Sequence, residues 1–168
     1  MQNVIDRMIA KQAEIRAKKD DEGFTLIELL VVVVIIGVLV AIAVPVYLNY
    51  RQGAADKSAQ SDVRGAISAV EQYYTGNGNT YPTNAATSIV ANSTPASSIT
   101  LPAQTGGTAG TITVSDKTEL TYVPPSGTSS YKICAKNTGG SGKVYLYDAS
   151  VGGSVKTASG ITPTATGC

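Results

Sequence analysis

Gly-Phe-Thr-Leu-Ile-Glu-Leu-Leu, at residues 23–30, opens an apolar run that continues to Leu48. No charged side chain occurs from Leu29 to Leu48. A helix rises about 1.5 Å per residue, so about 20 apolar residues span the ~30 Å hydrocarbon core of a bilayer. The sequence therefore predicts one transmembrane helix.

Glu28 lies near the start of that helix. A carboxylate in hydrocarbon costs on the order of 2.5–3.5 kcal/mol unless it is paired. Cleavage of the chain between Gly23 and Phe24 would create an α-amino group within one helical turn of Glu28, and also within reach of Glu28 in a neighbouring copy. The alternative is a glutamate that extends to the membrane interface, helped by the positive end of the helix dipole.

Residues 23–48 resemble a type IV prepilin almost position by position, because Gly is followed by Phe-Thr-Leu-Ile-Glu and an apolar helix. The resemblance implies that a membrane aspartic prepilin peptidase cleaves after Gly23 and N-methylates Phe24. It also implies that a pilus assembly ATPase and its platform machinery move the subunit from the membrane into a homo-oligomeric helical filament. There, Glu28 would pair with the Phe24 amine of a neighbour and set the axial register.

Residues 1–23 are expected to form a charged leader that is removed. Their basic residues are Arg7, Lys11, Arg16, Lys18 and Lys19. By the positive-inside rule, these residues keep the N-terminus in the cytoplasm and place the rest of the chain outside. A secretory signal peptide has its apolar core before the cleavage site, whereas here the apolar run follows Gly23. The long, charged leader resembles that of actinobacterial prepilins.

Two residues weaken the helix inside its membrane half. Pro45 removes the hydrogen bond to the Ala41 carbonyl, and Gly37 costs about 1 kcal/mol relative to alanine. A bend near Ala41 is therefore expected. The resemblance implies that the span from Gly37 to Pro45 loses helical hydrogen bonds in the filament. The alternative is an ordinary proline kink, which membrane helices tolerate.

Residues 24–50 are expected to form the transmembrane and assembly helix, and residues 51–168 a globular head. The helix should continue to about Tyr74 with an amphipathic second half. Its apolar or small stripe consists of Ala55, Ala59, Val63, Ala66, Ile67, Val70 and Tyr74. Mostly off that stripe are Arg51, Asp56, Lys57, Asp62, Arg64 and Glu71. Gly-Asn-Gly-Asn at 76–79 supplies the positive φ values that end a helix.

Strand signals follow a Ser- and Thr-rich connection that contains short apolar islands at 88–90 and 99–101. Short β-branched or aromatic segments then alternate with turn residues, at 111–114, 119–123, 131–136 and 143–148. Their close spacing favours an antiparallel meander. One face of it is expected to cover the helix, with Leu120, Tyr122, Ile133, Val144 and Leu146. The predicted fold class is α+β, a long N-terminal α-helix packed on a C-terminal antiparallel β-sheet, as in the pilin roll.

Cys134 and Cys168 are the two cysteines of the chain. In an exported domain such a pair is more often a disulfide than a metal or catalytic site. A bond between them would close a loop of about 35 residues, which is worth roughly 3–4 kcal/mol by chain entropy. It would also hold down the tail at 152–168, which has too little apolar area to fold by itself. The alternative is two free thiols.

The sequence shows no catalytic constellation, cofactor motif or metal-ligand spacing. The chain has no histidine, the commonest general base and metal ligand. Its acidic residues lack the spacing of a Ca²⁺ loop, and it has no P-loop or dinucleotide fingerprint. A net charge of +1 does not favour overall attraction to nucleic acid or anionic lipid. The chain is therefore expected to be a substrate of enzymes and not an enzyme.

The favoured function is that of a type IV pilus subunit, a single-pass cytoplasmic membrane protein before assembly and part of an extracellular fibre afterwards. Adhesion, twitching motility and DNA uptake are all open, with surfaces or extracellular DNA as partners. One alternative is the major pseudopilin of a type II secretion or competence DNA-uptake system. Another is a single-span surface protein that never polymerises.

Overall fold

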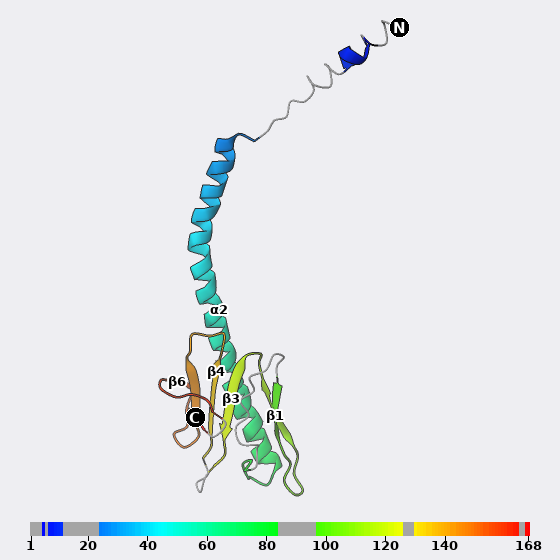
Figure 1. The fold of residues 1–168 in the computed structure, drawn as a ribbon. Coiled ribbons are helices and arrows are strands. Elements are labelled where there is room, and N and C mark those ends of the chain that lie inside the picture. Colours follow the sequence, from blue (N-terminus) through cyan, green and yellow to red (C-terminus); the bar gives the residue numbers. More distant parts are fainter. Residues whose placement is uncertain (1–4, 6, 12–23, 84–96, 126–129, 165–166) are drawn as a thin grey trace. The chain divides into compact units, whose positions relative to one another are not determined.

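The computed structural model describes residues 5, 7–11, 24–83, 97–125, 130–164 and 167–168. Its main elements follow one another along the chain as α2 (Leu26–Gly76), β1 (Ser97–Leu101), β2 (Gly110–Val114), β3 (Thr118–Val123), β4 (Lys132–Asn137), β5 (Val144–Asp148) and β6 (Lys156–Ala158) (Figure 1). The chain divides into two compact units, Met1–Val44 and Pro45–Cys168. The α+β class, with a long helix before antiparallel strands, is confirmed.

Helix α2 continues through Gly37 and Pro45, the two residues expected to weaken it. It is a single helical element from Leu26 to Gly76. The loss of helical hydrogen bonds between Gly37 and Pro45 concerns an assembled filament, and it stays a prediction.

The C-terminal end of α2 lies in the turn that the sequence predicts. The Asn77 side chain donates from Nδ2 to the Tyr73 carbonyl at 2.9 Å and accepts at Oδ1 from the Gln104 N–H at 3.1 Å. Gly78 and Asn79 have φ values of 64° and 56°, the left-handed conformation that glycine and asparagine adopt most readily. The helix therefore ends where its backbone turns and Asn77 ties it to the following chain.

The head half of α2 buries a stripe that differs from the expected one. Its buried residues are Asp56, Ala59, Asp62, Val63, Ala66, Val70 and Tyr73. Tyr73 belongs to this stripe, whereas the predicted Tyr74 is only partly buried. Asp56 and Asp62, expected on the solvated face, are only 4% and 8% exposed.

Hydrogen bonds to two serines explain why these aspartates are buried. The Asp62 carboxylate accepts from the N–H and the hydroxyl of Ser115, at 3.0 and 2.7 Å. The Asp56 carboxylate accepts from the same two groups of Ser141, and Lys143 lies 3.8 Å away. Buried carboxylates need such partners. Each aspartate thus fastens one turn of the β region to the helix.

The strands form two antiparallel sheets and not the single meander that was expected. β1 pairs with β2, while β3, β4, β5 and β6 pair in chain order. Between β2 and β3, the N–H of Ser115 is directed to Asp62 on the helix, and Lys117 has a φ of 59°. An amide that bonds to the helix cannot also extend a ladder between β2 and β3. The chain thus turns towards the helix between β2 and β3, and these two strands belong to different sheets.

The positions of the predicted strands are confirmed to within a residue or two. β1 corresponds to the apolar island at 99–101, while the island at 88–90 lies outside the described residues. β6 is the strand that the sequence did not indicate, because Lys-Thr-Ala carries little β propensity or apolar area.

The inner face of the four-stranded sheet was predicted correctly for β3 and β4 but not for β5. Ile133 pairs with Tyr147, and paired residues of adjacent strands share a face. Tyr145 and Tyr147 therefore face the core, where Tyr145 is 7% exposed. Val144 and Leu146, expected there, lie on the opposite face, where Val144 is nevertheless buried, at 4% exposed. The side chains on both faces of β5 are apolar enough for burial, so the sequence of β5 does not indicate which face lies in the core.

A cluster of tyrosines lies in the core between the helix and the sheet. The Tyr131 ring contacts the rings of Tyr81, Tyr122 and Tyr147, and Tyr81 also stacks on Tyr74, with centroids 4.4–5.8 Å apart. Glu71 Oε1 accepts from the Tyr131 hydroxyl at 2.6 Å and from the Tyr81 hydroxyl at 3.4 Å. Burial and the nearby Glu71 carboxylate raise the pKa of both phenols. Burial likewise raises the pKa of Tyr122, whose hydroxyl donates to the Pro82 carbonyl.

Candidate assembly and processing site

The start of α2 is held by reciprocal hydrogen bonds between Thr25 and Glu28. The Thr25 N–H and hydroxyl both donate to Glu28 Oε2, each at 2.8 Å. The Glu28 N–H lies 3.3 Å from the Thr25 hydroxyl oxygen, which accepts from it. The first helical bond follows, from the Leu29 N–H to the Thr25 carbonyl at 3.2 Å. This arrangement is a capping box, which satisfies donors that a helix start leaves unpaired.

The capping box places Phe24 just outside the helix. Phe24 is 85% exposed, and the helix begins at Leu26. Gly23, on the other side of the expected cleavage point, lies outside the described residues. The structure therefore describes the segment that would become the new N-terminus, but not the peptide bond to be cut.

Thr25 is the residue of this site to which the sequence interpretation gave no role. The interpretation sought a partner for Glu28 in an amine made by proteolysis, whereas the intact chain already supplies Thr25. Thr-Leu-Ile-Glu fits the pattern of Ser or Thr followed three residues later by Glu or Gln, which is the sequence signature of a capping box. That pattern would have identified Thr25 without a structure.

The helix surface beyond the capping box is apolar and uncovered. Every large apolar side chain from Phe24 to Tyr50 is at least 49% exposed. By length and composition, α2 is able to cross a membrane. A monomer in water would expose far more contiguous apolar surface than soluble proteins tolerate, so this surface requires lipid or another helix.

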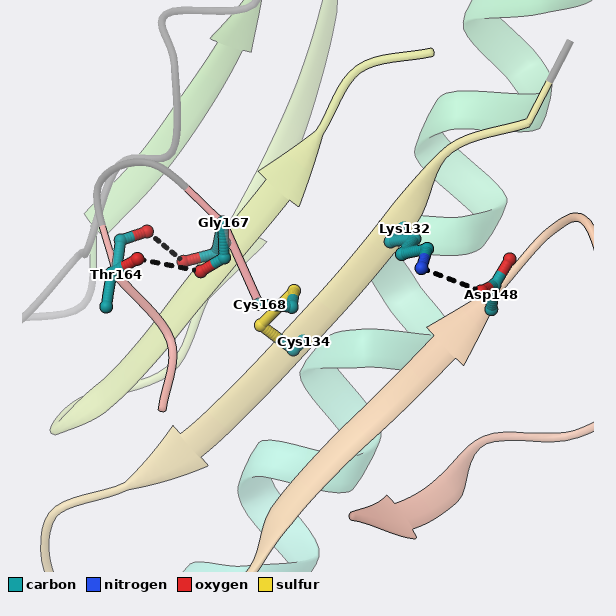
Figure 2. Close-up of a disulfide and its surroundings, with 7 residues drawn as sticks. Lys132, Cys134, Asp148, Thr164, Gly167 and Cys168 are labelled. Atoms are coloured by element: carbon teal, nitrogen blue, oxygen red, sulfur yellow. Dashed lines mark hydrogen bonds and ion pairs between the residues drawn. A yellow bond between two sulfur atoms is a disulfide. The ribbon is translucent and has the colours of Figure 1, made fainter. Parts of the chain in front are cut away.

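At the other end of the chain, a disulfide joins Cys134 in β4 to Cys168, with their Cα atoms 5.9 Å apart (Figure 2). The tail also bonds to itself, because the Thr164 N–H and hydroxyl both donate to the Gly167 carbonyl at 2.9 Å. The Thr121 hydroxyl donates to the Thr164 carbonyl at 3.0 Å. Cys134 alternates with the core residue Ile133, so the tail is attached to the outer face of the sheet.

The described residues contain no group of three or more His, Cys, Asp or Glu side chains placed to hold a metal ion. Asp148 is occupied locally, by the Ser150 hydroxyl and by Lys132 at 3.1 Å (Figure 2). The hydrogen bond from Ser150, with help from Lys132, lowers the pKa of this carboxyl. Asp148 thus has a structural role, as the partner of Ser150 and Lys132.

Residues 18–44 match the family model of the prokaryotic N-terminal methylation motif. The match contains the capping box, the residues on both sides of the expected cleavage point and most of the uncovered apolar helix. The chain therefore combines the prokaryotic N-terminal methylation motif with a long helix that precedes antiparallel sheets.

The similar proteins bear pilus and secretion names. The chain is 42% identical over 73 residues to a fimbrial protein of Neisseria meningitidis serogroup A, covering 44% of this chain and 42% of that protein. It is 39% identical over 102 residues to the fimbrial protein EcpC of Eikenella corrodens, covering 60% and 65%. It is 38% identical over 66 residues to the type II secretion system core protein G of Aeromonas hydrophila, covering 39% and 46%. The match thus spans less than two thirds of each relative, and no solved structure matches the chain.

Proposed function

We propose that this chain is a structural subunit of a type IV pilus. In this proposal residues 1–23 are a leader, residues 24–50 anchor the precursor in the membrane and then assemble, and residues 51–168 form the exposed head. The observation that carries the proposal is the uncovered apolar surface of residues 24–50 beside a methylation motif. Lipid covers that surface before assembly, and the helices of other copies cover it in the fibre.

Processing converts the start of the helix into a charged end. A prepilin peptidase cuts between Gly23 and Phe24, and the new Phe24 amine is methylated, which leaves its positive charge in place. In the described residues, the hydrogen bonds to Glu28 all go to Oε2. We infer that Oε1 accepts from the amine while the bonds from Thr25 to Oε2 keep the capping box closed. Pairing with the amine of a neighbouring subunit compensates the buried carboxylate and sets the register between copies.

A second candidate is the major pseudopilin of a type II secretion or DNA-uptake system, which shares the same helix and processing site. The similarity to the core protein G favours it. The disulfide that fixes the tail favours the pilus, in which such a region forms an exposed part of the fibre. Electron microscopy separates the two, because a pilin forms long extracellular fibres and a pseudopilin does not.

Substitutions of Glu28 and Thr25 distinguish the contribution of the Glu28 charge to assembly from the contribution of the helix cap. Glu28→Gln keeps a capping oxygen but removes the charge, whereas Thr25→Ala removes the cap and keeps the charge. We expect Glu28→Gln to reduce fibres about tenfold or more, since an unpaired amine in an apolar bundle costs at least ~1.4 kcal/mol. Thr25→Ala should reduce them less, because a cap is worth about 1 kcal/mol. Normal fibres with Glu28→Gln would refute the register role.

The N-terminus of surface fibres tests the processing step. Mass analysis should find an N-methylated Phe24 as the first residue, and cells without the peptidase should retain residues 1–23 and show no fibres by immunogold microscopy. An intact leader on a surface-exposed protein would instead support the single-span protein that never polymerises.

A further inference from the structure

A hollow of about 440 Å³ lies where the first head turns of α2 face two turns of the β region. The helix side contributes Leu48, Arg51, Gln52, Ala55 and Ser58, and the turns contribute Asp116, Lys117, Asn137 and Gly139. All of these residues belong to the unit Pro45–Cys168. The hollow plays no part in the proposed processing or in the pairing of Glu28.

Two cations line this hollow. In the described part of the chain, neither Arg51 nor Lys117 takes part in an ion pair. Asp116 also lines the hollow, so two positive charges face one negative charge. Asn137 is committed elsewhere, because its Nδ2 donates to the Asp116 carbonyl and to the Thr118 hydroxyl. The net charge of +1 left in the hollow matches one phosphodiester group.

The backbone holds Lys117 in an uncommon conformation. Its φ is 59°, where a glycine would be less strained, and its carbonyl accepts from both the N–H and the hydroxyl of Thr138. Residues in such strained conformations cluster at functional sites, so the Lys117 side chain is a candidate for contact with a ligand. Strain of this kind is often found where a ligand is bound.

The hollow lies directly after the apolar run of the helix. Leu48 ends the uncharged stretch, and Arg51 follows about 4.5 Å further along the helix axis at the usual rise per residue. Tyr47 and Tyr50 are 59% and 76% exposed, and the Arg51 guanidinium lies 5.8 Å from the Tyr47 ring centroid. Exposed tyrosines next to a membrane span are typical of the interface, at the level of the lipid headgroups.

We propose that this hollow binds the phosphate-bearing headgroup of an anionic phospholipid while the subunit resides in the membrane. Arg51 and Lys117 contact the phosphate, and Leu48 contacts the first carbons of an acyl chain. The lipid holds the head at a fixed depth and is released when the subunit enters the fibre. The inference rests on the membrane stage of the proposed function but not on fibre formation. The overall charge of the chain is irrelevant to it, since the site is local.

Native mass spectrometry of the full-length chain in detergent tests the site with phosphatidylglycerol and phosphatidylcholine. Arg51→Gln/Lys117→Gln should lower retention of phosphatidylglycerol about tenfold or more, since each basic group near a lipid surface adds about one fivefold step. Lys57→Gln/Lys156→Gln is the matched control, because it removes the same charge from exposed positions outside the hollow. Near-UV circular dichroism verifies that both variants keep the folded head.

The results decide as follows. Preferential retention of phosphatidylglycerol that is lost only in the Arg51/Lys117 variant supports the site. Equal retention of both lipids, or equal loss in both double variants, overturns it. Displacement of the lipid by millimolar inorganic phosphate overturns the lipid as occupant and assigns the hollow to free phosphate. Because no fibre is needed, a chain that fails to polymerise can still pass this test.

Discussion

The two halves of α2 have the same backbone but opposite relations to their surroundings. In the membrane half, every large apolar side chain is at least 49% exposed, and among the described residues it is Thr25 that donates hydrogen bonds to the Glu28 carboxylate. In the head half, the apolar stripe is fully covered and the buried aspartates are bonded to turns of the β region. The apolar surface of the head half is covered by residues of the same chain, whereas that of the membrane half requires lipid or further copies of the subunit. The difference can be tested by making like changes in each half.

The largest difference should come from truncating one tyrosine in each region. Tyr122 is 1% exposed in the head core, whereas Tyr47 is 59% exposed on the membrane half of the helix. Tyr122→Ala leaves a cavity and an unpaired Pro82 carbonyl, so it should destabilise the head by about 3–5 kcal/mol. Tyr47→Ala should leave head stability unchanged. Denaturant unfolding of the detergent-solubilised chain, followed by near-UV circular dichroism, measures both, and equal effects would contradict the division.

Removal of the disulfide should have the next largest effect. Cys168→Ala opens a loop between residues 34 positions apart and should cost roughly 3–4 kcal/mol in head stability. Membrane insertion should not change, because the bond lies wholly within the head. Reduction of the wild-type chain provides the control and should bring its unfolding midpoint down to that of the variant. A reductant-insensitive midpoint would show that the tail contributes nothing to the fold.

A smaller effect is expected from Asp62, which accepts hydrogen bonds from the turn between the two sheets. Asp62→Ala leaves the Ser115 N–H and hydroxyl without their acceptor, which should cost about 1–3 kcal/mol. Asp116→Ala removes the same charge from an exposed position in the same turn and should change stability by less than ~0.5 kcal/mol. Chemical denaturation of the two variants measures the difference. If they lose equal stability, the bonds to Ser115 are not what fastens this turn.

The last effect should be absent at neutral pH and appear only at high pH. Burial raises the pKa of Tyr122 and Tyr131, with Glu71 adding to the effect at Tyr131. The folded head therefore keeps these protons when the unfolded chain, whose tyrosines ionise near ~10, has lost them. Stability should be unaffected below about pH 10 and should fall as the pH rises above it, by up to ~1.4 kcal/mol per pH unit for each tyrosine.

Tyr131→Phe should make that alkaline fall shallower, while Tyr50→Phe, at a position 76% exposed, should leave it unchanged. Unfolding midpoints measured from pH 8 to about pH 11.5 give the two slopes. Identical slopes of stability against pH in the wild-type chain and in Tyr131→Phe would mean that the tyrosine cluster does not cause the loss of stability at high pH.

Local patterns allowed most of the elements to be predicted. The apolar run, the Gly-Asn-Gly-Asn helix end and the strands at 111–114, 119–123, 131–136 and 143–148 depend on neighbouring residues, and they were placed to within a residue or two. The predictions failed where distant residues decide. Tyr145 and Tyr147 face the core instead of Val144 and Leu146 because pairing with β4 sets the face of β5.

The site shows the same division. Thr25 and Glu28 are three residues apart, so a local pattern contains their capping box even though the first interpretation gave Thr25 no role. The burial of Asp56 and Asp62 depends on serines that are 85 and 53 positions away. Helical periodicity placed both aspartates off the apolar stripe, because it does not include the turns that fold back onto the helix.

Residues adjacent along the chain are enough to predict a membrane-length helix, a glutamate near its start, a methylation motif and a β-rich head. The fold in three dimensions was needed to see that the strands form two sheets, that five tyrosines form one cluster and that Arg51 and Lys117 line one hollow. These arrangements depend on contacts between residues that are distant in the sequence. The energies of such contacts depend on packing in three dimensions, and the contacts produce no periodic pattern in the sequence.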